Sequence, residues 1–236
     1  MEFSFRIGTE EYTVPKVITV DLFQRAIAWD IEQEKNIKPF VSVLTECPLD
    51  QLKLIEDDTF NIILAACVSR LDLSDTELRR NIGGFQFLNL DTITFGQFVD
   101  IDILIADGIT KHAIQLTEKL YGISEEVAAQ KDIREVWKAL ETAVEWRYSV
   151  YQEHNEFFEL DNNQGSDGPE MTIDNLQLMW YNAILVLAEQ KFLNIQYVTE
   201  RPYKEALNFL TWKKNEASKA QLEQLRKKND IQRRTR

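Results

Sequence analysis

Residues 124–148 read SEEVAAQKDIREVWKALETAVEWRY, and the spacing of their apolar side chains points to a helical protein. From Ile133 onward the apolar residues recur every three or four positions, which is typical of one buried helix face. They are Ile133, Val136, Trp137, Leu140, Val144 and Tyr148. Ser124 is a residue type that caps helix N-termini, so we expect one long helix from Ser124 through Tyr148.

The same spacing recurs on both sides of this stretch. Only eight Gly and five Pro occur in 236 residues, and few turn-formers favour helices joined by short connections. We therefore predict a mainly α fold. Further helices are expected over residues 19–31, 37–44, 48–55, 57–71, 94–105, 109–121, 172–187 and 202–212. Thr94 and Gln97 have capping-box spacing at the start of one of these helices, and Thr172 is the expected cap of another.

Two short segments alternate apolar and polar residues instead. Residues 3–15 predict a small N-terminal β-hairpin whose turn lies at Gly8–Glu11. Residues 85–88 predict a short strand that pairs with this hairpin. Ser74 and Glu77 have capping-box spacing, so a short helical segment is expected there until the glycine pair at 83–84 ends it. The expected class is thus mainly α with a small β component, a multi-helix domain with an extended basic C-terminal helix or tail.

The charge of the chain reverses near its C-terminal end. The formal net charge is −12, but residues 213–236 carry nine Lys or Arg against three acids, a net +6. Residues 1–212 therefore carry −18. A segment this basic and this poor in apolar residues forms no core of its own, so it is either a solvated helical extension or an arm that binds an acidic partner.

Composition also suggests the domain boundaries. Residues 155–170 are acidic and contain the turn-forming run 161–169, which is typical of a linker. We predict an N-terminal helical domain with its hairpin over residues 1–154, the linker over 155–170, a C-terminal helical hairpin over 171–212 and the basic tail over 213–236.

The sequence offers no catalytic or metal-binding pattern. It has only two histidines, and Asp100 and Asp102 point about 200° apart on a helix, so they cannot share an ion without other ligands. The Gly83–Gly84 pair lacks the spacing of a phosphate-binding loop, and residues 161–172 fail the calcium-loop pattern at Gly165 and Thr172. We expect no enzyme activity, no cofactor and no metal, and we nominate no catalytic residue.

Compartment signals favour the cytoplasm. Cys47 and Cys67 lack metal-ligand spacing and are expected to be buried thiols. The first residues lack the pattern of a secretory signal, and no stretch approaches the ~18 apolar residues of a membrane span. A body charge of −18 disfavours nucleic acid as a general partner, so only the tail is expected to contact phosphates.

Candidate partner-binding residues come from the tail and from two tryptophans. Trp180 and Trp212 lie among apolar residues at helical spacing, which fits either core packing or an exposed groove for another protein. The candidate set is Lys213, Lys214, Lys219, Arg226, Lys227, Lys228, Arg233, Arg234, Arg236, Trp180 and Trp212.

Four motifs resemble a known family. Residues 18–24 (ITVDLFQ), then 41–45 (VSVLT) followed by 47–52 (CPLDQL), resemble the opening of the small helical tail-assembly chaperones of tailed bacteriophages. Residues 94–102 (TFGQFVDID) look like a block common in related phage morphogenesis proteins. The acidic spacer, residues 180–188 (WYNAILVLA) and the charged tail are similar in layout to the longer chaperone form. Glu46 and Cys47 depart from the small turn residue usual in this family.

The resemblance implies a non-enzymatic protein that covers apolar helical segments of a tape-measure-type protein in the host cytoplasm during virion assembly. The alternative is a structural virion protein, such as a neck or connector ring subunit or a packaged cargo protein. Its tail would then dock on an acidic neighbour, a portal or neck component, another copy of the chain, or DNA. Neither role involves a membrane.

Overall fold

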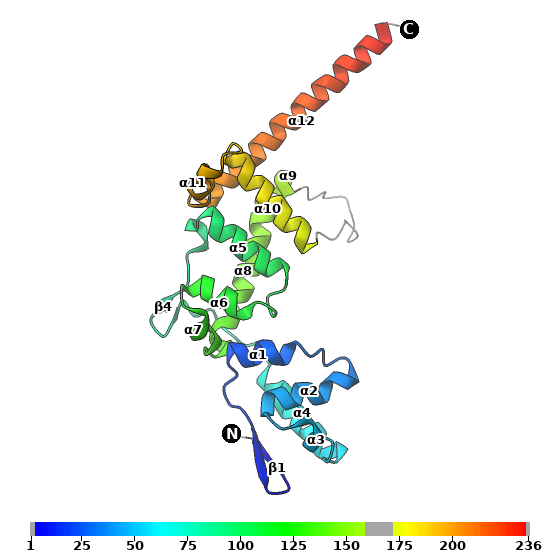
Figure 1. Ribbon diagram of the computed structural model, residues 1–236, viewed down its shortest axis with the longest axis vertical. Coiled ribbons are helices and arrows are strands. Elements are labelled where there is room, and N and C mark those ends of the chain that lie inside the picture. The colour runs from blue at the N-terminus through cyan, green and yellow to red at the C-terminus, as the bar shows by residue number, and fades with distance from the viewer. Residues whose placement is uncertain (1–2, 159–171, 235–236) are drawn as a thin grey trace. The chain divides into compact units, whose positions relative to one another are not determined.

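A computed structural model describes residues 3–158 and 172–234 of the chain, with side chains described up to Lys227. The described residues form twelve α-helices, two short 3-10 helices and two small two-stranded antiparallel sheets (Figure 1). The predicted mainly α class with a small N-terminal hairpin is confirmed.

The chain divides into two compact units that do not follow the expected boundary at residue 154. Unit 1 comprises residues 1–88 and 104–143, and unit 2 comprises residues 89–103 and 144–236. Helices α5 (Phe95–Ala106) and α8 (Ile133–Glu153) therefore contribute residues to both units. The expected linker at 155–170 begins with helix α9 (Asn155–Phe158), and residues 159–170 lie outside the described residues.

Unit 1 begins with a hairpin followed by helices. Strands β1 (Phe3–Ile7) and β2 (Glu10–Val14) pair from Phe3 with Val14 to Ile7 with Glu10, and the turn uses Gly8 at a φ of 61°. The remaining elements are α1 (Val20–Ile27), α2 (Glu34–Thr45), α3 (Leu49–Leu52), α4 (Asp57–Arg70), β3 (Asn81–Ile82), β4 (Phe85–Gln86), α6 (Ala113–Tyr121) and α7 (Glu125–Ala129).

The prediction of a single long helix from Ser124 is wrong, because the helix is interrupted between α7 and α8. Ser124 does cap a helix, since its hydroxyl accepts a hydrogen bond from the Val127 amide at 3.4 Å. That helix ends at Ala129. The Lys131 carbonyl then accepts from the Val20 amide at 2.9 Å, and the Ile133 amide donates to the Ile18 carbonyl at 2.8 Å. This pairing with residues distant in sequence holds the chain extended where local propensity favours helix.

The segment after α4 also differs from expectation. Ser74 does not cap a helix, because its hydroxyl and amide donate to the Asp72 carboxylate at 2.6 and 3.1 Å. Strand β4 exists, but it pairs with β3 and not with the N-terminal hairpin. Gly83 and Gly84, with φ values of 60° and 93°, form the turn between these strands and do not end a helix. Local pairing across a tight glycine turn took precedence over the longer-range pairing.

Unit 2 is built around α5, the second half of α8 and three C-terminal elements. They are α10 (Ile173–Leu187), α11 (Ile195–Thr199) and α12 (Tyr203–Arg234), with the 3-10 helices η1 (Leu90–Thr92) and η2 (Phe192–Asn194). Two predicted caps are confirmed. Thr94 and Gln97 exchange capping-box hydrogen bonds at 3.0 and 3.2 Å, and Thr172 accepts from the Asn175 amide at 3.4 Å.

A buried carboxylate lies at the centre of unit 2. Asp102 is fully buried and accepts three hydrogen bonds: from Arg147 Nε at 2.7 Å, from the Tyr151 hydroxyl at 3.0 Å and from Trp180 Nε1 at 2.7 Å. The pKa of Tyr151 is raised above its ordinary value, mainly because the hydroxyl is buried and also because of the nearby Asp102 charge. The hydroxyl therefore stays protonated and can donate. From the sequence, Asp102 was considered only as a metal ligand together with Asp100. One carboxylate instead joins α5, α8 and α10.

Aromatic side chains surround this carboxylate. The Phe98 ring stacks on Tyr203 with centroids 5.2 Å apart, and it meets the edges of Trp146 and Trp180 at 5.5 and 5.4 Å. Edge-to-face and offset pairs at these distances each add about 0.5–1.5 kcal/mol to the burial of the rings. The cluster therefore fixes the first turn of α12 against α5, α8 and α10.

The buried ion pair predicts a large effect for a small substitution. Asp102→Asn keeps the side-chain volume but leaves the half-buried Arg147 guanidinium without its counter-charge, which we expect to cost about 3 kcal/mol of unfolding free energy. Urea titration followed by near-UV circular dichroism measures this cost. The matched control is Asp100→Asn, two residues away on the exposed side of α5. A cost below about 1 kcal/mol at Asp102 would contradict the assignment.

Acid should weaken the packing of α8 on α12 through His154. This side chain is 3% exposed, with Nδ1 3.3 Å from Thr211 Oγ1, and burial lowers its pKa although the Glu153 charge acts in the opposite direction. An unfolded histidine titrates near pH ~6.5, so its contribution to stability is present above that pH and is lost as the pH falls through it. We expect the unfolding temperature to drop between pH 7.5 and 5.5, and to drop less in His154→Gln. Parallel pH profiles for the two proteins would contradict this.

Candidate protein-interaction surface

A groove opens on unit 2 where the end of α10, α11 and the start of α12 meet. Its volume is about 310 Å³. The lining residues are Leu187, Glu189, Tyr197, Val198, Arg201, Glu205, Ala206 and Phe209. Val198 and Ala206 are buried, whereas Tyr197 and Phe209 reach the surface. The groove thus has an apolar floor and aromatic walls, with charged groups at its rim.

The rim charges are paired within the protein. Arg201 donates to Glu205 at 3.1 Å, and its guanidinium carbon lies 5.4 Å from the Tyr197 ring centroid. Lys191 donates to Glu189 at 2.9 Å, and this hydrogen bond, with the charges of Lys191 and Lys213, lowers the pKa of Glu189. The groove therefore offers apolar area without a strong charge of either sign.

Two residues in left-handed backbone conformation turn the chain into this region. Glu189 and Gln190 follow α10 with φ values of 54° and 59°, a conformation that costs a non-glycine residue roughly 1–2 kcal/mol. The Gln190 amide donates to the Leu185 carbonyl at 2.9 Å and the Asn194 amide group donates to the Ala188 carbonyl at 3.2 Å, which offsets part of this cost. The sharp turn places η2 and α11 beside the end of α10.

Glycine allows α11 to lie close to α5. A Cβ added at Gly96 would come within 3.2 Å of the Thr199 carbonyl oxygen and side chain, so a larger residue would push α11 away. The backbone also pairs here, because the Phe95 amide donates to the Arg201 carbonyl at 2.7 Å. These contacts hold α11, which lines the groove, close to α5.

Large apolar side chains are exposed in this part of the chain, and two of them, Tyr197 and Phe209, line the groove. Phe192 is 83% exposed, Leu193 90%, Tyr197 63%, Phe209 45% and Trp212 57%. The Phe209 and Trp212 ring centroids lie 5.6 Å apart. We call these five residues the apolar surface. Isolated exposed apolar residues are ordinary, but five of them within residues 192–212 make this surface the candidate interaction site of unit 2.

The two predicted tryptophans have different environments. Trp212 is exposed as part of the apolar surface. Trp180 is only 1% exposed and donates to Asp102, so the expectation that it contacts a partner is corrected. The helical spacing that nominated both residues cannot distinguish a position facing α5 and α8 from one facing solvent.

The predicted basic residues from Lys213 to Arg234 lie on a continuous helix. Helix α12 runs from Tyr203 to Arg234, so the basic segment is a helical extension and not a separate tail (Figure 1). Lys213, Lys219, Arg226 and Lys227 are exposed, whereas Lys214 is half-buried and its Nζ donates to the Phe157 carbonyl at 2.9 Å. The side chains of Lys228, Arg233 and Arg234 lie beyond those described, and Arg236 is outside the described residues.

Sequence reasoning missed Phe192, Leu193 and Tyr197. They lie between two predicted helices, in a segment to which no element was assigned. One signal was present: Phe192 and Leu193 are adjacent large apolar residues directly after the polar run Glu189–Lys191, and adjacent positions cannot both face one core from a helix.

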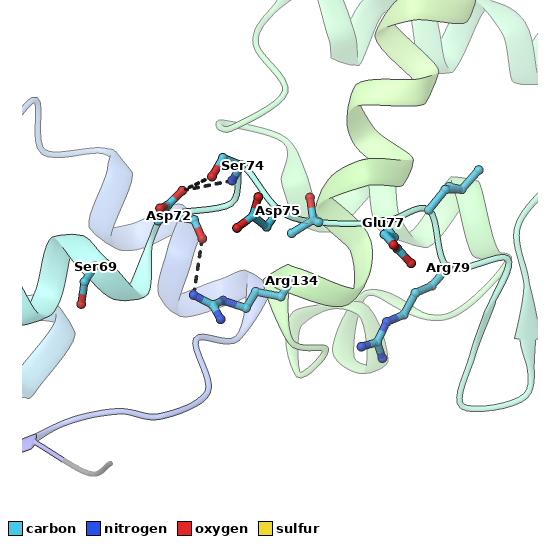
Figure 2. A pocket seen from close by; sticks show the side chains of 9 residues that line it. Ser69, Asp72, Ser74, Asp75, Glu77, Arg79 and Arg134 are labelled. Carbon is cyan, nitrogen blue, oxygen red and sulfur yellow. Dashed lines mark hydrogen bonds between the residues drawn. The ribbon is translucent and has the colours of Figure 1, made fainter.

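A second cavity, in unit 1, is polar (Figure 2). It measures about 440 Å³ and is lined by Ser69, Asp72, Ser74, Asp75, Thr76, Glu77, Leu78, Arg79 and Arg134. Both of its arginines are engaged by the protein itself: Arg134 donates to the Asp72 carbonyl at 3.4 Å, and Arg79 pairs with Glu135. Acids and guanidiniums are mixed around it, so we assign no ligand class to this cavity.

Comparison of the chain with protein-family models, with curated proteins and with solved structures gives no match. Within residues 3–158 and 172–234, no helix is long and apolar enough to cross a membrane. The same described part contains no group of three or more His, Cys, Asp or Glu side chains arranged to hold a metal ion. Cys47 and Cys67 are buried free thiols, as the sequence indicated.

The distal half of α12 should be dispensable for stability. Every side chain from Glu216 to Lys227 is exposed, so removing residues 218–236 should shift the unfolding temperature by no more than about 2 °C. Removing residues 213–236 should cost more, because it deletes the Lys214 contact with Phe157 and the Asn215 contact with Glu156. Thermal denaturation of both truncations checks this. A fall above about 5 °C for the shorter deletion would show that the distal helix packs on the body.

Proposed function

We propose that this protein is a non-enzymatic bacteriophage morphogenesis protein of the tail-assembly-chaperone type. It binds helical segments of a tape-measure-type protein stoichiometrically in the host cytoplasm and releases them as the tail tube forms. The observation that carries the proposal is the apolar surface around the unit 2 groove, which exposes five large side chains next to a charged helix. The motif resemblance at residues 18–52, 94–102 and 180–188 supplies the phage context.

The chemistry of the groove suits a helix better than a small polar substrate. An amphipathic helix inserts side chains spaced three or four residues apart into an apolar groove between other helices. Leu187, Val198 and Phe209 come from three different helices and enclose room for one or two such side chains. Burying each of them against the partner would contribute about 1.5–3 kcal/mol before the cost of ordering the partner.

A structural virion protein is the second candidate. It is favoured by the distal part of α12, where Leu222 and Leu225 are 57% and 56% exposed among basic residues. In a neck or connector ring this helix would dock on an acidic neighbouring subunit, on another copy or on DNA. The two candidates differ in the fate of the protein after assembly.

Two measurements separate these candidates. Quantitative mass spectrometry of purified virions should find the chain absent, while co-expression with the tape-measure protein of the same phage should yield a soluble complex. Phe192→Ser with Leu193→Ser should reduce the yield of that complex at least fivefold, and Ile62→Ser, at a site 60% exposed in unit 1, is the matched control. The intact chain at a defined copy number per particle would overturn the chaperone proposal in favour of the virion component.

A further inference from the structure

One face of α12 runs on from Phe209, which lines the groove. Starting from Phe209, the positions at steps of three or four residues are Lys213, Ala217, Ala220, Gln224 and Lys227. With 3.6 residues per turn these positions share one face of the helix. All five are exposed, and Lys213 is near enough to Glu189 for its charge to act on that carboxylate. Two of the five are alanines, which let a second helix approach closely.

Charges of alternating sign flank this face. Lys219 pairs with Glu216 at 3.1 Å, Glu223 lies one turn further along, and Arg226 and Lys227 follow. Over residues 213–227 there are five Lys or Arg and two Glu, a net +3. Charges that alternate beside an apolar or small-residue stripe are typical of a helix that pairs with another helix, in which salt bridges select the partner and its register.

This charge pattern distinguishes among three kinds of binding partner for the groove and α12: a second copy of the chain, DNA and an acidic helix. Two copies of α12 lying side by side would bring together two helices of net +3, which charge repulsion opposes. DNA would meet Glu216 and Glu223 on the same helix, and its phosphates would gain nothing from the apolar groove, because they are bound by cationic and hydrogen-bond donor groups. A helix with a net negative charge satisfies both the groove and the cationic excess.

From this geometry we infer that the bound segment is an acidic amphipathic helix. Its large apolar side chains enter the groove at Tyr197 and Phe209, and its acidic residues lie beside Lys213, Arg226 and Lys227. The span from Phe209 to Lys227 is about 27 Å of helix, so the segment needs roughly 20 residues. The inference rests on the proposed function in binding a helical segment and adds the charge, length and docking path of that segment.

Binding of designed helical peptides to the full chain tests the inference. Two fluorescein-labelled 24-residue peptides carry leucine at the same three- and four-residue spacing, with Glu at the polar positions of one and Lys in the other. Fluorescence anisotropy should show the acidic peptide binding at least tenfold more tightly than the basic one. Raising NaCl from 50 to 300 mM should weaken binding of the acidic peptide several-fold, because the charges on α12 are exposed to solvent and are therefore screened by salt.

Variants assign the docking path. The triple variant Lys213→Glu, Arg226→Glu and Lys227→Glu should bind the acidic peptide at least tenfold more weakly. Lys16→Glu with Lys35→Glu, two exposed sites in unit 1, should leave its affinity unchanged. Phe209→Ser should weaken the binding of both peptides. Leu193→Ser should do the same, and because Leu193 is 90% exposed this variant tests the apolar surface even if Phe209→Ser folds poorly. Circular dichroism of each variant checks its fold.

The outcomes separate this inference from the chaperone proposal. Equal affinity for the two peptides, a preference for the basic one, or tighter binding of a 24-base-pair DNA duplex would overturn the inference. If neither peptide binds but the tape-measure complex still forms, the inference is overturned and the proposed function stands. Detection of the chain in virions together with tight binding of the acidic peptide would refute the chaperone role and retain the acidic helix as partner.

Discussion

The architecture of unit 2 depends on one buried carboxylate. Asp102 has no contact with solvent, and an ion of this kind is tolerated only when hydrogen bonds replace its hydration. Arg147 and Tyr151 supply two of these bonds from α8, and Trp180 supplies the third from α10. Because the donors come from helices that are distant in sequence, satisfying Asp102 requires α5, α8 and α10 to meet in a single arrangement.

That arrangement leads directly to the groove. Trp180 holds α10 in the core, and the left-handed pair Glu189 and Gln190 then turns the chain so that η2 and α11 lie beside its end. Gly96 admits α11 close to α5. The exposure of Phe192 and Leu193 therefore follows from the turn that places η2 beside the end of α10. The turn brings these two apolar side chains to the surface of unit 2.

Helix α12 changes role along its length. Tyr203, Leu207 and Leu210 are buried in unit 2, while every described side chain from Glu216 onward is exposed. The first part is stabilised by packing. The second part depends on helix propensity and on pairs such as Glu216 with Lys219, each worth only a few tenths of a kcal/mol. The helix is therefore held by packing near the groove, and its side chains from Glu216 to Lys227 are exposed to solvent.

The amino-acid sequence by itself determined the mainly α class, the N-terminal hairpin, the caps at Thr94 and Thr172 and the reversal of charge at Lys213. These depend on local spacing and on capping chemistry, which act within a few residues. Tertiary structure decided the break between α7 and α8, the pairing of β4 with β3, the burial of Trp180 and Asp102, and the exposure of Phe192 and Leu193. Each of these depends on which distant segment supplies a hydrogen bond or covers a side chain, and periodicity shows that a helix has an apolar face without showing what will cover it.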